Sequence, residues 1–265
     1  MKSYVMTDVH GYYSIMMDTL KNAGFFSETE PSRLILLGDL LDRGKEAIKM
    51  TEFMKSLSDE GRLVYVRGNH EDLFVSCLQE ISQGEVFNVS SPYSHHLSNG
   101  TWDTMLQLAQ MDKDSALRYP RELVSRVMRT AFYKELLPTT VDYYETERYV
   151  FVHGFIPARE SGRGEFKWYN YNPDWRDGDY DEWRRARWYN GMSLASSFGV
   201  REPGKTVVCG HYHTSYGHSC IKHMCTEWGD DAIFDVYRDD GIIALDASTA
   251  NSGKMNCIVF EEEEL

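Results

Sequence analysis

Polar blocks at five places along the chain carry side chains that can hold divalent metal ions. They are Asp8-Val-His10-Gly, Gly38-Asp39-Leu-Leu-Asp42-Arg43-Gly, Arg67-Gly-Asn69-His70-Glu, His153-Gly and Gly210-His211-Tyr-His213. Their carboxylates, amide and imidazoles offer oxygen and nitrogen donors without thiolates. Such a donor set suits Mn²⁺, Fe²⁺ or Zn²⁺ in a functional site, whereas a structural zinc site typically uses cysteine thiolates. The first chemistry that these residues predict is therefore metal binding.

Each block directly follows a short apolar run that is typical of a buried strand. The runs are Ser3–Met6, Arg33–Leu37, Leu63–Val66, Tyr149–Val152 and Thr206–Cys209. Amphipathic helical patterns lie between the early runs, which predicts βαβ units with parallel strands. Parallel strands deliver their carboxyl ends to one rim of a sheet, the usual place of a ligand site. A single block would be weak evidence, but five blocks in strand-exit positions predict one shared site.

Composition narrows the class of protein. The 265 residues have 42% hydrophobic residues and a formal net charge of −13. This charge disfavours binding to nucleic-acid polymers. No apolar run approaches the ~20 residues that a membrane span needs, and the first residues lack the apolar core of a signal peptide. Five cysteines fit a reducing compartment better than a disulfide framework, so we expect a cytoplasmic protein without a membrane partner.

One domain over residues 1–265 is expected. Residues 85–138 show only helical periodicity and predict a helical insertion beside the α/β core. Residues 159–204 are aromatic and charged without a clear period, and we expect long ordered loops there.

The ordered set of blocks resembles the calcineurin-like metallophosphoesterases. Within that family it is similar to the serine/threonine phosphoprotein phosphatases and the bacterial symmetrical diadenosine-tetraphosphate hydrolases, which share Asp-Arg-Gly and Arg-Gly-Asn-His-Glu. The segment from Gly241 to Val259 also looks like the last strands of that group. The resemblance implies an α/β fold, a four-layer sandwich of two mixed sheets flanked by helices.

The resemblance also implies two divalent metal ions, with Mn²⁺ favoured over Fe or Zn. Asp8, His10 and Asp39 would hold the first ion, and His213 could complete its ligands. Asp39 would bridge to a second ion, whose other ligands would be Asn69, His153 and His211. A hydroxide between the two ions would attack phosphorus in line.

Further residues would act on the phosphoryl group. Arg43 and Arg67 would bind its oxygens, and His70, hydrogen-bonded to Asp42, would protonate the leaving oxygen. The alternatives are a supporting role for His70 and a helix-start charge for Asp42. Arg187, in Trp-Arg-Arg-Ala-Arg-Trp, is a candidate phosphate ligand. Its alternative is an arginine stacked on tryptophan and paired with Asp181 or Glu182.

Hydrolysis of phosphate monoesters is the predicted function, with a phosphoprotein or a small phosphoester as substrate. A diadenosine polyphosphate hydrolase is the alternative enzyme, and an inactive binding scaffold is the alternative outside catalysis. His213 is the second histidine of Gly-His-Tyr-His. Its presence is a difference from the phosphoprotein phosphatases, which generally keep only the first histidine. A histidine in the pocket wall is therefore the other interpretation of His213.

Overall fold

The computed structural model describes residues 1–84, 95–163 and 166–261. All five strands expected from the apolar runs are confirmed. They are β1 (Lys2–Met6), β2 (Ser32–Leu37), β3 (Leu63–Val66), β5 (Tyr149–Phe151) and β8 (Thr206–Cys209). Their near-continuous apolar character follows from burial on both faces.

The strands form two mixed sheets. The first has the order β11-β1-β2-β3 and the second has the order β4-β5-β8-β10-β9. Each sheet has three neighbouring parallel strands. An antiparallel strand lies at one edge of the first sheet and at both edges of the second. The additional strands are β4 (Tyr144–Glu145), β9 (Tyr237–Asp239), β10 (Ile242–Ala244) and β11 (Ile258–Phe260).

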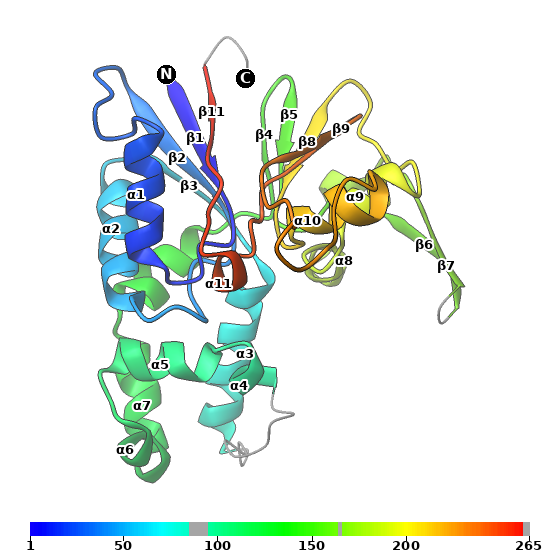
Figure 1. Cartoon of the computed structure of the whole chain (residues 1–265). Coiled ribbons are helices and arrows are strands. Elements are labelled where there is room, and N and C mark those ends of the chain that lie inside the picture. Colours follow the sequence, from blue (N-terminus) through cyan, green and yellow to red (C-terminus); the bar gives the residue numbers. More distant parts are fainter. Residues whose placement is uncertain (85–94, 164–165, 262–265) are drawn as a thin grey trace.

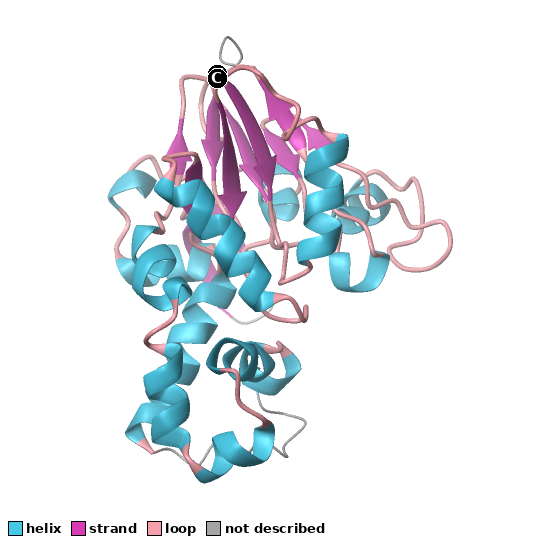
Figure 2. Ribbon diagram, turned by 90° about the vertical axis from the view of Figure 1, so that its left-hand side faces the viewer, coloured by secondary structure: helices cyan, strands magenta, loops and turns pink. Residues whose placement is uncertain are grey.

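Side chains of each strand alternate between two hydrophobic clusters. In β2, Ile35 and Leu37 pack between the sheets against Phe151 and Val208 of the second sheet. Leu34 and Leu36 point the other way, toward the helices α1 (Tyr13–Asn22), α2 (Ala47–Asp59) and α3 (Asn69–Gln83). A third cluster joins the second sheet to α8 (Tyr180–Ala186) and α9 (Gly191–Ser196). The predicted α/β class with two mixed sheets flanked by helices is confirmed (Figures 1 and 2).

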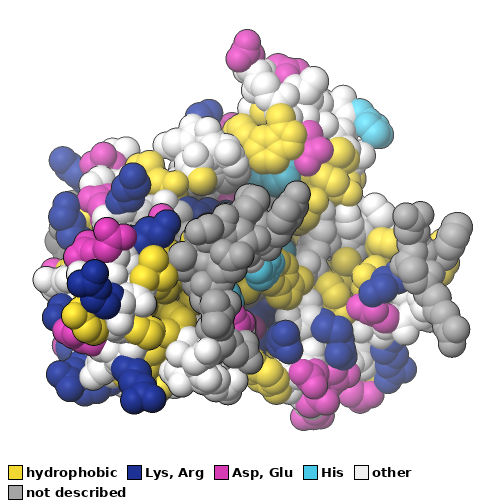
Figure 3. Space-filling view, turned by 90° about the horizontal axis from the view of Figure 1, so that it is seen from below, with side chains coloured by type: hydrophobic (Ala, Val, Ile, Leu, Met, Phe, Trp, Pro, Cys, Tyr) yellow, Lys and Arg dark blue, Asp and Glu magenta, His cyan; other side chains and the backbone are white. Residues whose placement is uncertain are grey.

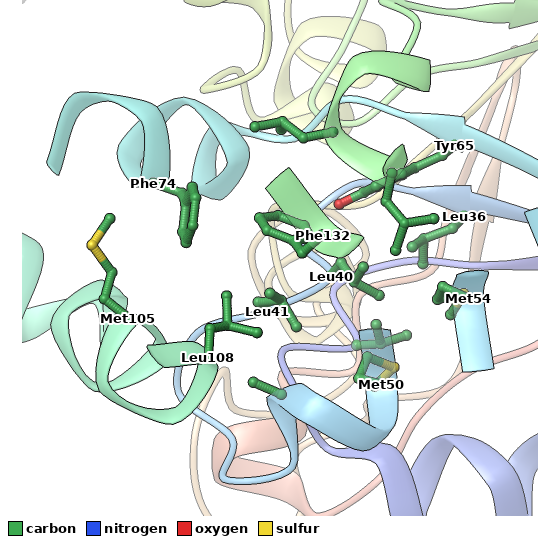
Figure 4. Packing of buried hydrophobic residues seen from close by; sticks show 14 of the residues in the cluster. Leu36, Leu40, Leu41, Met50, Met54, Tyr65, Phe74, Met105, Leu108 and Phe132 are labelled. Atoms are coloured by element: carbon green, nitrogen blue, oxygen red, sulfur yellow. The ribbon is translucent and has the colours of Figure 1, made fainter. Parts of the chain in front are cut away.

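The region of the predicted insertion is helical from residue 95 to residue 139. It comprises α4 (His95–Ser98), α5 (Thr101–Ala109), α6 (Lys113–Arg118), α7 (Pro120–Val127), a π-helical turn (Phe132–Leu136) and a 3-10 turn (Leu137–Thr139). Residues 85–94 of the predicted insertion lie outside the described residues. Phe74 of α3 meets Phe132, and Met105 and Leu108 of α5 join the same cluster, so the insertion shares the core of the first sheet (Figure 4).

The expectation of long loops over residues 159–204 is wrong for much of that segment. It contains the hairpin β6 (Arg159–Arg163) and β7 (Phe166–Asn170), a 3-10 turn (Trp175–Asp177), α8 and α9. The hairpin has no buried face along most of its length, so it lacks apolar alternation. The two helices have seven and six residues, too few to show a helical period.

Short helical elements complete the C-terminal part. They are α10 (Thr214–Tyr216), a π-helical turn (Gly217–Ile221) and α11 (Thr249–Ser252). Across the described ranges, no helix is both long enough and apolar enough to cross a membrane.

Candidate metal centre

The loops that follow β1, β2, β3, β5 and β8 meet at one rim, toward which these strands run (Figure 1). Backbone hydrogen bonds join them: the amide of His10 donates to the carbonyl of Asp39 at 2.9 Å, and that of Gly210 donates to His153 at 2.7 Å. The sequence-predicted convergence of strand ends is thus present in the structure.

Several site residues adopt left-handed backbone conformations, which side chains other than glycine rarely adopt. The φ angles are 50° for Asp8, 47° for His10, 56° for Asp39, 74° for Asp42 and 64° for His211. Each such residue costs roughly 1–3 kcal/mol and persists only where its surroundings impose it. This concentration of strain at one rim marks a functional site rather than a simple set of turns.

Glu71 is the buried carboxylate that imposes part of this loop geometry. It accepts hydrogen bonds from the amides of Asp39 (3.0 Å), Leu40 (3.0 Å) and Gly68 (2.7 Å) and from the Tyr65 hydroxyl (2.6 Å). Sequence reasoning did not assign this role. The available signal is the position of Glu71 in the third place of α3, where a glutamate reaches back to the helix start.

Three potential metal-binding atoms converge at His153. Its Nδ1 donates to the carbonyl of Leu37 at 2.7 Å, so its Nε2 is the ring nitrogen that faces the other donors. That Nε2 lies 2.8 Å from Asn69 Oδ1 and 3.4 Å from Asp39 Oδ1. His211 completes the group, because ligand atoms of Asp39, His153 and His211 lie within 4.8 Å of one another. Acceptors that face one another in this way fit a cation between them.

A second group of donors lies on the other side of the Asp39 carboxylate. His10 Nδ1 donates to the carbonyl of Leu41 at 3.0 Å, which leaves its Nε2 unprotonated. This Nε2 is 3.7 Å from Asp39 Oδ2 and 3.8 Å from Asp8 Oδ1. The other oxygen of Asp8 accepts from the amide of His211 at 2.9 Å. Asp39 thus faces both groups, as a carboxylate shared by two ions would.

Burial sets the protonation of these groups. It lowers the pKa of His10 and of His211 well below the ordinary value, and neighbouring cationic groups act in the same direction. Both imidazoles are therefore neutral at neutral pH, the form in which a histidine can bind a metal ion. Burial also raises the pKa of Asp39 well above its usual range, although His70 opposes this effect. A buried carboxylate that lacks sufficient positive charge fits a site for cations.

His70 lies beside the centre and forms a dyad with Asp42. Its Nδ1 donates to Asp42 Oδ2 at 2.7 Å, and its Nε2 lies 3.8 Å from Asp39 Oδ2. Burial lowers the pKa of His70, but the charge of Asp39 and the hydrogen bond to Asp42 outweigh it and raise the pKa overall. The Thr101 hydroxyl of the insertion also donates to Asp42 Oδ2, at 2.7 Å. Sequence analysis missed Thr101, which lies 59 residues from Asp42.

The three predicted arginines have different environments. Arg43 is at the centre: its Nη1 lies 2.9 Å from His10 Nε2 and its Nη2 lies 3.3 Å from His70 Nε2. Arg67 donates through Nε to Asp72 at 2.7 Å, and its side chain stays partly exposed. Arg187 is buried and pairs with Asp72 at 2.6 Å and with Asp142, rather than with the predicted Asp181 or Glu182. Its charge is thus already used within the fold.

His213 is not brought into either group of donors among the described residues. Its Nε2 lies 2.7 Å from Glu227 Oε1, and its ring packs on Tyr212 and Trp228. Glu227 is thus the hydrogen-bond partner of the imidazole that the sequence pattern predicted as a metal ligand.

Comparisons with known proteins agree with this geometry. A model of the calcineurin-like phosphoesterase family matches residues 1–215. A symmetrical bis(5'-nucleosyl)-tetraphosphatase of Salmonella arizonae is 25% identical over 284 residues, which cover 100% of the chain and 93% of that relative. One from Edwardsiella ictaluri is 32% identical over 124 residues, or 44% of the chain and 42% of the relative.

Solved structures show the same fold at low sequence identity. A proposed diadenosine tetraphosphatase has a TM-score of 0.51 at 14% identity, over 100% of the chain and 90% of that protein. The cold-active protein-tyrosine phosphatase of a Shewanella species has a TM-score of 0.53 at 15% identity, over 98% and 75% of the two chains.

We predict that Mn²⁺ raises the melting temperature of chelator-treated protein. An ion at 100 times its Kd stabilises the folded state by about 2.7 kcal/mol, because it binds the folded chain only. For a chain of this size that equals about 5–10 °C, measurable by differential scanning fluorimetry. Asp39→Asn should abolish the shift. Asp18→Asn, at an exposed position of α1, is the matched control and should keep it. A shift that survives in Asp39→Asn would contradict the assignment of Asp39.

Proposed function

Because the chain belongs to the calcineurin-like phosphoesterase family, we propose that it transfers a phosphoryl group from a phosphate ester to water at a centre of two divalent metal ions. One observation carries this proposal. Asp39 presents one carboxylate oxygen to His153 and the other to His10, while Arg43 and His70 lie beside it.

The proposed ligands are the residues of the two donor groups. Asp8, His10 and Asp39 would hold one ion, and Asp39, Asn69, His153 and His211 would hold the other. We propose Mn²⁺ as the resident metal, although the donors also suit Fe and Zn. When bound, such ions polarise phosphoryl oxygens and make water a nucleophile at neutral pH. His213 is left out of this set because of its contact with Glu227.

Arg43 is the proposed phosphate-binding residue. Its two terminal nitrogens both face the centre, and a guanidinium matches two phosphoryl oxygens in a bidentate manner. Arg67 is less available to bind phosphate, because its Nε donates to Asp72 and its Nη1 donates to Thr140 at 3.3 Å. Arg187 would act indirectly, by neutralising Asp72 so that this carboxylate does not repel an anionic substrate.

His70 is the proposed general acid. In the reaction, the oxygen of a water that releases a proton to solvent forms a new bond to phosphorus, and the bond between phosphorus and the leaving oxygen breaks. The proton on His70 Nε2 goes to that leaving oxygen. Asp42 supports this role, since its hydrogen bond to Nδ1 fixes the ring and favours the cationic form.

Two kinds of substrate are candidates. A phosphate monoester, such as a phosphoprotein, is the prediction from sequence. A diadenosine polyphosphate is the second, and the full-length similarity to a symmetrical tetraphosphatase favours it. Rates of the Mn²⁺-loaded protein on a phosphopeptide and on diadenosine tetraphosphate would separate the two. Absence of hydrolysis of both, and of an aryl phosphate, would leave the binding scaffold as the remaining interpretation.

We predict that His70→Asn lowers kcat on alkyl phosphates by ~10²–10⁴-fold, the usual contribution of a general acid. On p-nitrophenyl phosphate the loss should be much smaller, because nitrophenolate leaves without a proton. Steady-state kinetics on both esters, with bound metal measured by elemental analysis, test this. Equal losses on the two esters would argue against His70 as the acid.

Thr101 gives a second prediction. Thr101→Val removes the hydroxyl that helps to orient Asp42. It should lower kcat on alkyl phosphates by roughly 10- to 100-fold, since one hydrogen bond to a charged group contributes roughly 1.5–3 kcal/mol. Thr101→Ser keeps a hydroxyl and should recover most of the rate. If valine and serine variants behave alike, or if both esters lose rate equally, Thr101 does not act through the dyad.

A further inference from the structure

Helix α5 of the insertion lies against the loop that carries Asp42 and Arg43. This loop leads from β2 to α2, and both residues have left-handed backbone conformations, with φ angles of 74° and 60°. Such a backbone persists only where its surroundings impose it. Seen from below, the insertion lies to the left of the histidine side chains near the middle of the face (Figure 3). The contacts of α5 with this loop therefore help to decide where both side chains point.

The first turn of α5 holds Asp42. The Thr101 hydroxyl donates to its carboxylate at 2.7 Å, and the Thr104 hydroxyl accepts from its backbone amide at 3.0 Å. Gly100, directly before α5, allows the helix to come this close, because a Cβ atom there would lie 2.5 Å from the backbone nitrogen of Arg43. Side chain and backbone of Asp42 are thus both fixed by the insertion.

Gln107, one turn further along α5, binds the backbone that follows Arg43. Its Nε2 donates to the carbonyl of Gly44 at 3.1 Å, and its Oε1 accepts from the amide of Ala47 at 3.2 Å. Ala47 is the first residue of α2, and an amide at the start of a helix has no acceptor within that helix. One side-chain amide therefore connects the loop carbonyl to the start of α2.

Helix α5 is itself fixed in the core. Its residues Met105 and Leu108 belong to the same hydrophobic cluster as Leu41 and Phe74 (Figure 4). Gln107, by contrast, is only partly buried. A substitution of Gln107 can therefore remove its two hydrogen bonds while the packing of α5 stays as it is.

We propose that Gln107 is a positioning residue for the reaction and that it acts through Arg43. By holding the backbone after Arg43, it directs the guanidinium toward the phosphoryl group. A guanidinium binds two phosphoryl oxygens only in a matching orientation, so a small displacement weakens binding strongly. This inference rests on the proposed function, in which Arg43 binds phosphate, and it gives the insertion a part in substrate binding.

The test begins with Gln107→Met, which keeps the length of the side chain and removes both hydrogen bonds. With Mn²⁺-loaded protein, it should raise the Kd of inorganic phosphate and the KM for p-nitrophenyl phosphate about tenfold, with kcat nearly unchanged. Isothermal titration calorimetry and steady-state kinetics measure these constants. Gln79→Met, the same change at an exposed position of α3, is the matched control and should leave both constants at the wild-type values. If Gln107→Met does not fold, Gln107→Glu replaces it, because it loses only the donor to Gly44; the same direction of change is expected.

A double-mutant cycle shows whether Gln107 acts through Arg43. In Arg43→Ala there is no guanidinium to direct, so adding Gln107→Met should lower kcat/KM by less than about twofold. A further tenfold loss in that background would show that Gln107 acts independently of Arg43, which contradicts the proposal.

The remaining outcomes separate this role from the proposed function. If the wild type hydrolyses p-nitrophenyl phosphate and Gln107→Met binds phosphate as tightly as the wild type, the positioning role is wrong and the proposed function stands. If Gln107→Met lowers kcat without weakening phosphate binding, Gln107 supports the fold alone and the proposal is equally wrong. If the wild type does not hydrolyse p-nitrophenyl phosphate, the proposed function fails, and the role of Gln107 fails with it.

Discussion

Burial of carboxylates at one rim is the constraint on which the rest of this structure depends. Asp8, Asp39, Asp42, Glu71 and Asp246 are all less than 8% exposed. A buried charge is costly unless hydrogen bonds or opposite charges compensate it. Glu71 is compensated by backbone amides and Asp42 by His70 and Thr101. Asp246 accepts a hydrogen bond from the amide of Ser248, and burial and the charge of Asp8 raise its pKa to about 8. Asp8 and Asp39 accept such hydrogen bonds on one oxygen only. Among the described residues, Asp8 Oδ1 and Asp39 Oδ2 have none, and these two oxygens face His10 in the donor groups that fit cations.

The fold supplies this arrangement through close backbone approach. A Cβ atom on Gly68 would lie 2.2 Å from Asp39 Oδ1, and one on Gly210 would lie 1.9 Å from Thr7 Oγ1. Such distances exclude any side chain at these two positions. Parallel strands from both sheets thus end close enough for their loops to share hydrogen bonds, and the strained residues of these loops are held in place from several sides.

The sequence predicted the features that depend on neighbouring residues along the chain. The apolar runs predicted the strands, and the polar blocks after them predicted which loops meet, because parallel strands share a rim. It failed where a side chain takes its partner from a distant element. Arg187 meets Asp72 across 115 residues, and Thr101 meets Asp42 across 59. The partner of His213, Glu227, is nearer in sequence, but no pattern marks it. Short exposed elements such as the β6–β7 hairpin also carry too few buried residues to show a period.

The position of bound metal tests the account most directly. A crystal structure of the Mn²⁺-soaked protein, with anomalous scattering recorded at the manganese edge, would locate the ions without any assumption about activity. The account predicts two anomalous peaks ~3.5–4 Å apart, one on each side of the Asp39 carboxylate. A single peak away from Asp39, or fully loaded protein with no peak at this rim, would contradict it.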